Sequence, residues 1–274
     1  MDEIDRFLDE DLRKKGDITS NGLLNTRQKA KAMIIAKQEC IVAGLYEAGV
    51  VFKKTGATPR LLHKDGTAVK NGDRVMKIQG SARSILKAER LALNIIGRMS
   101  GIASETEKLV RHCKHINKNV TIAATRKTTP GFRKFEKKAV KLGGGEAHRF
   151  GLFDAVLIKD NHLKLVGSVS EAIRRMKKTY PRKTIEIEVE NETDALSAAQ
   201  MGVGIIMLDN LSPGDGEHIA QKIRKINPGI LIEVSGGITD QNIEQYASFA
   251  DRISMGYLTH SVKNKDFSLE IFKN

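Results

Sequence analysis

The sequence predicts an α/β protein in two parts, a mixed N-terminal domain and a barrel of parallel strands. In the first 80 residues, strand and helix patterns follow one another without regular strand–helix–strand spacing. From Thr121 onward, short apolar runs alternate with amphipathic stretches, as in a parallel sheet with covering helices. Each of these runs ends in a charged or polar residue or a glycine. This favours a barrel, because all its strand ends face one mouth.

The N-terminal part begins with a short amphipathic helix over residues 1 to about 15. A turn at Gly16–Ser20 should end this helix, with Asp17 as a capping or turn residue. Further elements are expected as a strand at 29–41, a helix at 45–52, and short strands at 60–63 and 74–78. A long helix over about 84–115 follows, interrupted or bent at Ser100-Gly101. We place the domain boundary within residues 100 to 118.

The second part supplies six strand patterns and five helix patterns. The strands are expected at 121–125, 155–159, 184–189, 204–208, 230–234 and 252–255. The helices are expected near 131–142, 169–179, 192–201, 214–226 and 239–247. This alternation predicts a parallel sheet, either open or closed into a barrel.

Composition limits the class of protein. At 274 residues and 40% hydrophobic content, the chain is long enough for a sizeable core. No apolar run reaches the length of a membrane-spanning helix, so no membrane association is expected. The acidic, amphipathic N-terminus is unlike a secretory signal, so we expect a cytoplasmic protein. Cys40 and Cys113 stand far apart in the sequence, which argues against a cysteine-based zinc site or a disulfide framework.

The net charge is +13, from 46 Lys and Arg against 33 Asp and Glu. Such an excess is compatible with nucleic acid, with small polyanionic substrates, or with a merely solvated basic surface. The aromatic content of 5%, with no Trp, is poor for stacking on single-stranded bases. Charge alone therefore leaves the partner open.

Cationic side chains gather near the ends of the first two strands of the second part. Arg126 and Lys127 follow the first strand, Lys159 ends the second, and His148-Arg149 lies between them. Because Arg binds carboxylate or phosphate through two hydrogen bonds and Lys acts as a point charge, we expect a site for a polyanionic substrate here. A solvated face is expected for the lysines of the intervening helix, Lys134, Lys137, Lys138 and Lys141.

Glu188 and Asp209 are the acidic counterparts, at the ends of adjacent strands. Alternation places Glu186, Glu188 and Glu190 on one strand face, which would be the interior of a barrel. A buried carboxylate there requires a cation or a metal as partner. Near a ribose, the pair could hold hydroxyl groups, hold Mg²⁺, or stabilise positive charge at an anomeric carbon.

Glycines follow the last two strands of the second part. Ser235-Gly236-Gly237 precedes a predicted helix start, and Gly256 precedes Tyr257. Backbone N–H groups at such glycines, with a helix N-terminus behind them, can bind a phosphate monoester. The alternative is that these glycines only form tight turns.

Several short motifs occur in a fixed order over nearly the whole chain. They are ERLALN at 89–94, SGIA at 100–103, TRKTTPG at 125–131, GGG at 143–145 with His148-Arg149, IKDNH at 158–162, LDN at 208–210, SGG at 235–237 and LTHS at 258–261. On these motifs the chain resembles the quinolinate phosphoribosyltransferase family. The resemblance implies an N-terminal α/β sandwich domain (1–105) and an incomplete, open TIM-like α/β barrel (106–260). It also implies a C-terminal tail (261–274) that packs back towards the N-terminal domain.

The resemblance implies phosphoribosyl transfer from phosphoribosyl pyrophosphate to quinolinate with decarboxylation, a step of de novo NAD biosynthesis that needs Mg²⁺. It also implies a homodimer, sometimes a hexamer, in which Arg90 enters the neighbouring subunit's site. The implied catalytic residues are Lys127, Lys159, Glu188 and Asp209, the two acids also serving Mg²⁺, partly through the substrate. The implied substrate-binding residues are Arg90, Thr125, Arg126, Lys127, His148, Arg149, Lys159, Glu188, Asp209, Ser235, Gly236, Gly237, Gly256 and His260.

Three other interpretations remain open from the sequence. A molybdenum-transport-associated relative shares the Thr-Arg-Lys and His-Arg motifs but lacks the block at Lys159–His162. A phosphate-binding barrel aldolase would use Lys159 to form a Schiff base, in an apolar setting. A nucleic-acid-binding protein would lose affinity steeply with salt. This third interpretation rests on charge alone, and we expect no nucleic-acid partner.

Overall fold

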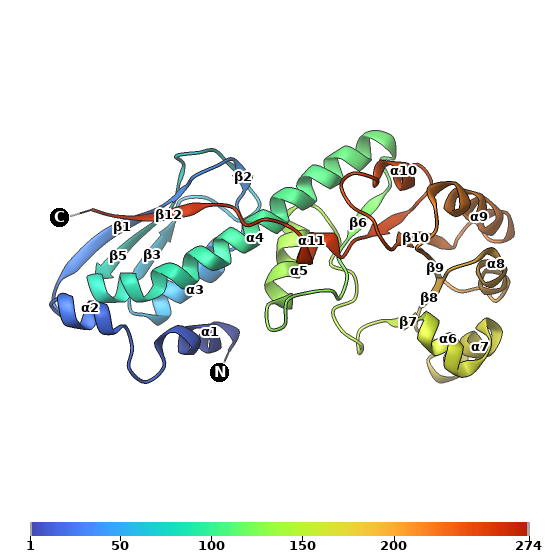
Figure 1. The fold of residues 1–274 in the computed structure, drawn as a ribbon, viewed down its shortest axis with the longest axis horizontal. Coiled ribbons are helices and arrows are strands. Elements are labelled where there is room, and N and C mark those ends of the chain that lie inside the picture. Colours follow the sequence, from blue (N-terminus) through green and yellow to red (C-terminus); the bar gives the residue numbers. More distant parts are fainter. Residues whose placement is uncertain (1, 273–274) are drawn as a thin grey trace. The chain divides into compact units, whose positions relative to one another are not determined.

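The computed structural model describes residues 2–272, which form two compact units (Figure 1). The first unit comprises the residues up to Glu107, Thr129–Gly144, and the residues from Val262 onward. The second unit comprises Lys108–Thr128 and Gly145–Ser261. The first contains an antiparallel sheet and the second a parallel sheet, so the predicted α/β class is confirmed. None of the helices between residues 2 and 272 is long and apolar enough to cross a membrane.

The first unit is built on a four-stranded antiparallel sheet in the order β12-β1-β5-β3. The strands are β1 (Lys29–Ala36), β3 (Thr58–Leu61), β5 (Arg74–Ser81) and β12 (Phe267–Phe272). Every second residue of β1 is buried, from Ala30 to Ala36, because alternate side chains of a strand share one face. α3 (Leu45–Lys54) packs against β3 and β5. β12, from the end of the chain, thus becomes an edge strand of this sheet.

Smaller elements complete the N-terminal region. α1 (Glu3–Leu12) begins with a capping box between Asp2 and Asp5. β2 (Cys40–Ile41) pairs with β4 (Ala68–Val69), so the strand predicted at 29–41 is in fact two strands. α2 (Ile18–Leu23) was predicted as a turn; Asp17 is its N-cap and accepts the Ser20 N–H at 3.0 Å. Ile18 and Leu23 are 70% and 79% exposed, so this helix has no apolar face that a sequence pattern would reveal.

The long helix α4 (Ala82–Ile116) runs unbroken through Ser100-Gly101, so the predicted interruption was wrong. The glycines of this helix serve close packing instead. A Cβ at Gly97 would lie 2.8 Å from the Lys265 carbonyl oxygen, and one at Gly101 would collide with the Lys263 carbonyl oxygen. The Lys265 N–H donates to the Gly97 carbonyl at 2.9 Å. Glycine therefore lets the segment before β12 cross the helix in direct contact with its backbone.

The first unit also contains α5 (Arg133–Leu142), and two of its lysines do not lie on a solvated face as predicted. Lys137 is 2% exposed. The Lys138 Nζ is 2.7 Å from the Glu47 carboxylate and 3.4 Å from that of Asp65. The helical spacing of the lysines did not reveal these acidic partners, because they come from a distant part of the sequence.

The second unit contains a six-stranded parallel sheet in the order β6-β11-β10-β9-β8-β7. Its strands are β6 (Thr121–Ala123), β7 (Val156–Ile158), β8 (Ile185–Val189), β9 (Ile205–Asp209), β10 (Leu231–Ser235) and β11 (Arg252–Ser254). All six predicted strands are present, with ends within two residues of expectation. β6 and β7 are the two ends of the sheet order, so the barrel is open, as predicted. A single bridge from Ala123 to Glu146 extends the sheet beyond β6.

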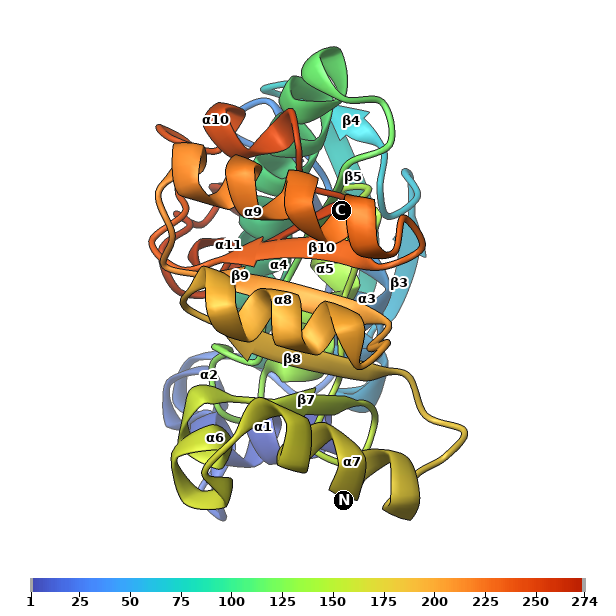
Figure 2. The same cartoon turned by 90° about the vertical axis from the view of Figure 1, so that its right-hand side faces the viewer.

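Helices cover the outer face of this parallel sheet, and Figure 2 shows α7, α8 and α9 in front of the strands. The helices are α6 (Asp160–Val166), α7 (Val169–Thr179), α8 (Glu192–Gln200), α9 (Pro213–Ile226), α10 (Glu244–Ala247) and α11 (Tyr257–His260). α7, α8 and α9 match the predictions closely, and each begins at a side-chain N-cap. The helix predicted at 239–247 is reduced to the four residues of α10, whereas α6 and α11 were not predicted.

Candidate active site

A cleft of about 390 Å³ opens at the carboxyl end of the parallel sheet. The register explains which side chains reach it: Glu188 pairs with Met207, and Asp209 pairs with Ser235, so alternate residues of neighbouring strands share the inner face. The cleft is lined by Ala124, Thr125, Arg126, Lys127, His148, Arg149, Leu157, Lys159, Glu188, Met207, Asp209, Ser235 and Ser254. The structure thus brings nine of the predicted site residues together in one unit.

Lys159, Glu188 and Asp209 form the polar centre of the cleft. The Lys159 Nζ lies 2.7 Å from Glu188 Oε2, and the Glu188 side chain is 9% exposed. Burial raises the pKa of Asp209, and the neighbouring Glu188 raises it further, while Lys159 and Lys127 oppose the shift. Asp209 also accepts a hydrogen bond from the Asn210 side chain at 2.7 Å. Two carboxylates that repel each other beside a lysine form a site that favours an additional positive charge.

The position of Lys159 is set by the residues that follow it. The Lys159 N–H donates to the Nδ1 of His162 in the first turn of α6 at 2.9 Å. Asp160 in the same turn pairs with Lys164 at 2.8 Å. The Lys-Asp-Asn-His motif therefore has a structural role. It begins a short helix and fixes the backbone of Lys159, whose side chain lines the cleft.

Arg126 and Arg149 supply the anion-binding side of the cleft. Burial lowers the pKa of Arg149, and the nearby Arg126 lowers it further, whereas Glu186 and Glu188 support the charged form. The Nε of Arg126 is buried and has no hydrogen-bond partner within residues 2–272. A bound carboxylate or phosphate would satisfy this nitrogen and relieve the repulsion between the two guanidinium groups.

His148 does not lie free in the cleft, as a simple ligand role would suggest. Its Nε2 is 3.4 Å from Glu186 Oε1 and 3.2 Å from Glu233 Oε1, and its side chain is 7% exposed. Burial alone would lower the pKa of His148, but the two carboxylates raise it to about 9. The Arg149 N–H donates to Nδ1 at 2.8 Å, which requires that this nitrogen carries no proton. The backbone hydrogen bond thus favours the neutral ring and offsets part of the carboxylates' effect.

The glycine-rich corner differs in part from the prediction. Gly236 and Gly237 have φ of 90° and 60°, which favours glycine, and a Cβ at Gly236 would collide with Asn210. The helix start expected near Thr239 is wrong, since α10 begins only at Glu244. α11 begins directly after Gly256 but has four residues, too few for a strong helix dipole. The backbone of the corner, not a helix end, is what this region offers to an anion.

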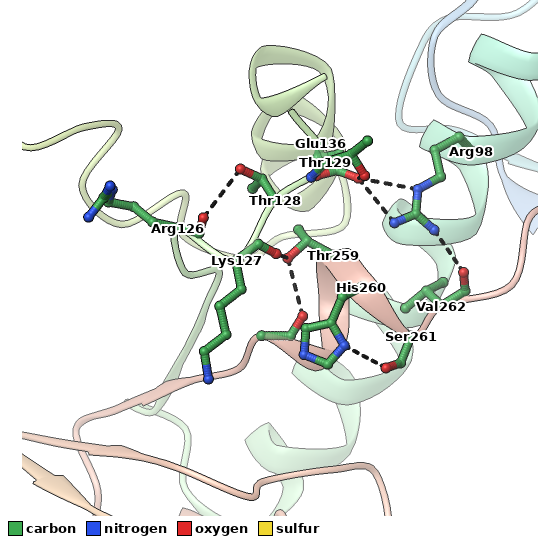
Figure 3. Close-up of polar contacts among 11 residues, drawn as sticks. Arg98, Arg126, Lys127, Thr128, Thr129, Glu136, Thr259, His260, Ser261 and Val262 are labelled. Carbon is green, nitrogen blue, oxygen red and sulfur yellow. Dashed lines mark hydrogen bonds and ion pairs between the residues drawn. The ribbon is translucent and has the colours of Figure 1, made fainter. Parts of the chain in front are cut away.

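Gly256 lies beside Lys127 and His260 rather than in an empty loop. A Cβ there would be 2.8 Å from Lys127 Cδ and 2.9 Å from His260 Nε2. Thr259 Oγ1 donates to the Lys127 carbonyl at 2.7 Å, and His260 contacts Ser261 Oγ at 2.6 Å (Figure 3). α11 thereby holds the main chain of Lys127 while Gly256 leaves space for its side chain.

Two family models match the chain, and together they cover nearly all of it. The quinolinate phosphoribosyl transferase C-terminal domain matches residues 102–270, and the N-terminal domain of the same family matches residues 17–100. The chain belongs to the quinolinate phosphoribosyl transferase family. The resemblance inferred from the short motifs is therefore confirmed.

Relatives in this family match nearly the full length of the chain. A probable carboxylating nicotinate-nucleotide pyrophosphorylase of Methanocaldococcus jannaschii is 45% identical over 264 residues, covering 94% of this chain and 92% of its own. A protein of the same description from Archaeoglobus fulgidus is 42% identical over 261 residues, covering 94% and 99%. The solved nicotinate-nucleotide pyrophosphorylase of Ehrlichia chaffeensis superposes with a TM-score of 0.92 at 35% identity, covering 98% and 97%.

The remaining predicted site residues do not line the cleft. In addition, two residues close to the cleft were not predicted from the sequence. Arg90 is exposed on α4 in the first unit of this transferase-family fold. Gly236 and Gly237 follow β10, Gly256 precedes α11 and His260 ends it, all within the second unit, and Gly256 lies beside the cleft residue Lys127. The buried Glu233 and the half-buried Arg252 were not predicted, although alternation along β10 places Glu233 on the same face as Ser235.

Proposed function

We propose that this protein transfers a phosphoribosyl group from phosphoribosyl pyrophosphate to quinolinate, with decarboxylation, and yields nicotinate mononucleotide, pyrophosphate and CO₂. One observation carries the proposal: a single cleft joins two close guanidinium groups to a lysine with two carboxylates. The guanidinium side suits a dicarboxylate. The lysine–carboxylate side suits a ribose that develops positive charge while an anionic group leaves.

Quinolinate carries two adjacent carboxylates on a pyridine ring. Arg126 and Arg149 can bind them with two hydrogen bonds each, and the unpartnered Nε of Arg126 is one donor ready for this. Each charge-assisted hydrogen bond contributes roughly 1.5–3 kcal/mol. Holding both carboxylates fixes the ring in the cleft, so the ring nitrogen can face the lysine–carboxylate side.

The transfer step exchanges one bond at the ribose. The lone pair of the pyridine nitrogen bonds to the anomeric carbon, while the carbon–oxygen bond to pyrophosphate breaks and its electron pair leaves with the pyrophosphate. Glu188 and Asp209 favour the positive charge that develops on the ribose, and Lys127 and Lys159 stabilise the leaving group. Burial raises the pKa of Asp209 and the charge of Glu188 raises it further, so positive charge on a ribose beside it would favour the Asp209 carboxylate.

Decarboxylation requires no further group from the protein. After transfer, the ring nitrogen is a cation, and it stabilises the electron pair that stays on the neighbouring ring carbon as the bond to the carboxylate breaks and CO₂ leaves. A proton from water then completes the carbon–hydrogen bond. The protein's part is orientation of the carboxylate and exclusion of bulk water.

We further propose that Glu188 and Asp209 hold Mg²⁺, partly through the substrate. The two carboxylates offer the hard oxygen ligands that a divalent cation prefers. The pKa of Asp209 is raised by burial and by Glu188, so a cation between the two acids would stabilise their charged forms. When bound, Mg²⁺ would neutralise oxygens of the pyrophosphate leaving group. The corner at Ser235, Gly236, Gly237 and Gly256, with His260, is proposed to hold the 5′-phosphate through backbone N–H groups.

Arg90 and the assembly are the last part of the proposal. Arg90 is exposed on α4 and belongs to the first unit, whereas the cleft residues belong to the second. We propose a homodimer, or a hexamer assembled from such dimers, in which Arg90 adds a third guanidinium to the neighbouring subunit's cleft. We also propose a cytoplasmic location, where phosphorylated sugars and pyridine nucleotides are handled.

The test is a reaction of the purified protein with quinolinate, phosphoribosyl pyrophosphate and Mg²⁺, followed by chromatography. We expect nicotinate mononucleotide to form, and nicotinate in place of quinolinate to give far less. The Arg149→Ala variant should keep its fold and lose quinolinate turnover. A wild-type protein that forms no nucleotide over a range of pH and temperature would refute the proposal.

A further inference from the structure

Two buried carboxylates lie beneath the anion-binding cleft, where acids are unexpected. Glu186 on β8 is 3% exposed and Glu233 on β10 is 0% exposed. Both direct an oxygen at His148 Nε2, at 3.4 Å and 3.2 Å. Negative charge close to a site for a dicarboxylate repels the substrate. The presence of two such charges therefore calls for a role that outweighs this repulsion. The proposed function leaves both of these acids without a role.

A metal centre is one possible purpose, because one ligand atom from each of His148, Glu186 and Glu233 lies within 4.8 Å of the others. The hydrogen bonding argues against it. The Arg149 N–H donates to His148 Nδ1, so in the neutral ring the proton is on Nε2, the atom that a metal would need. In addition, the Arg252 guanidinium already pairs with Glu233 Oε2 at 3.0 Å. The cluster is therefore built for a cationic or N–H partner.

The cluster is anchored at both ends to the rigid sheet. Arg252 on β11 contacts Glu233 and also Glu146, at 3.2 Å. The Glu146 main chain is bonded to β6: its N–H donates to the Ile122 carbonyl, and its carbonyl accepts the Ala124 N–H, both at 2.8 Å. The segment leading to His148 is thus fixed before it turns into the cleft.

His148 itself has an unusual backbone. Its φ is 53°, in the left-handed region that residues other than glycine seldom adopt, although histidine does so more often than most, so surrounding contacts help to hold it there. The next residue, Arg149, donates its N–H to the His148 ring and presents its guanidinium in the cleft. The direction of the Arg149 backbone therefore depends on the ring of His148. The ring's Nε2 lies at ion-pair distance from the two carboxylates without a hydrogen bond to either, so their hold on the ring is electrostatic.

We propose that Glu186 and Glu233 are positioning residues, which hold His148 through its Nε2 and thereby set the Arg149 guanidinium for the carboxylates of the substrate. This rests on the proposed function of the cleft, since it assigns Arg149 to the dicarboxylate. The two acids act on binding of the pyridine dicarboxylate and leave the phosphoribosyl donor side of the cleft unchanged.

The test uses Glu233→Gln and Glu186→Gln, which keep the side-chain volume and remove the charge. Because displacing a binding group by about 1 Å can cost up to about 100-fold, we expect KM for quinolinate to rise about tenfold in each variant. KM for phosphoribosyl pyrophosphate should stay within about twofold of wild type, since the ion pairs of these acids are with His148 and Arg252 rather than with the proposed donor-binding residues. Glu217→Gln, at an exposed position on α9, is the matched control and should change neither constant.

Direct titration of quinolinate onto each protein separates this inference from the proposed function, because it measures binding without turnover. Weaker quinolinate binding in both variants, with unchanged binding of the donor, supports the positioning role whether or not turnover is seen. Equal weakening for both substrates, or a stoichiometric metal in the wild-type protein that Glu233→Gln loses, overturns it.

Should the variants fail to fold, the wild-type protein still tests the idea. Hydrogen exchange of the Arg149 amide should be strongly slowed, since this N–H is bonded to a buried ring. Exchange at the rate of an exposed loop would show that the ring does not hold Arg149 and would overturn the inference.

Discussion

A methyl group at Gly256 should disturb the reaction without disturbing the fold. In Gly256→Ala, the new Cβ would lie 2.8 Å from Lys127 Cδ and 2.9 Å from His260 Nε2. Carbon atoms in ordinary contact lie about 3.5–4.0 Å apart, so the Lys127 side chain must move by roughly 1 Å. Gly256 has φ of −64°, which alanine adopts without strain.

The expected effect differs between activity and stability. A misplacement of about 1 Å can lower the rate by up to about 100-fold, and we expect kcat to fall between about ten- and 100-fold, or about 1.4–2.7 kcal/mol in the barrier. The displaced atoms belong to side chains rather than to a fixed backbone. The free energy of unfolding should therefore change by less than about 1 kcal/mol.

The assay is steady-state kinetics for both substrates together with urea unfolding. Gly214→Ala is the matched control, because a Cβ there meets no atom of residues 2–272 within 4 Å. It should leave kcat unchanged. A Gly256→Ala protein with wild-type kcat would refute the idea that Gly256 makes space for a working Lys127, and a loss of stability as large as the loss of activity would point to a packing role instead.

Three further predictions follow from the charges and thiols. Arg90→Ala and Lys127→Ala proteins, each inactive alone, should regain partial activity after mixing and subunit exchange; failure despite proven exchange would place Arg90 outside the neighbour's cleft. Burial lowers the pKa of His148, but Glu186 and Glu233 raise it to about 9. Its ionisation therefore stabilises the fold fully below about pH 6.5 and loses this effect as pH rises through about 9, by at most about 3 kcal/mol less the contribution of the Arg149 N–H bond that a proton on Nδ1 displaces. The free energy of unfolding of the wild-type and His148→Gln proteins, measured between about pH 6 and 9.5, tests this contribution. Identical pH profiles for the two proteins would contradict a role for His148 ionisation in stability. Burial raises the pKa of Cys40 and Cys113 to about 11, so neither thiol should react with iodoacetamide at pH 8 until the protein unfolds; rapid labelling of the native protein, read by mass spectrometry, would show that burial does not protect them.

The parallel sheet and its strand ends were readable because each strand carries its own local signal. An apolar run of about five residues, followed by polar residues or glycine, marks a buried strand and the start of a loop, and parallel strands bring those loops to one edge. Lys159, Glu188 and Asp209 follow from this logic, and the structure places all three in one cleft.

The features of the site and fold that could not be predicted from the sequence depend on contacts between segments that are distant in the chain. Glu233 and Arg252 form an ion pair across two strands, and the His148 ring at the cleft wall faces the buried acids Glu186 and Glu233. The α5 helix has a clear amphipathic pattern, but no local signal shows that it belongs to the first unit. Short helices such as α11 lack the length at which periodicity becomes visible.

The most direct test of the proposed chemistry compares two products of one reaction. Quinolinate labelled in the carboxylate next to the ring nitrogen is incubated with the protein and Mg²⁺, with and without phosphoribosyl pyrophosphate, and labelled CO₂ and nicotinate mononucleotide are both measured. Equal amounts of the two products, formed only when the donor is present, are the result that the cleft geometry predicts. CO₂ released without the donor, or nucleotide formed without loss of label, would contradict a mechanism in which transfer to the ring nitrogen drives decarboxylation.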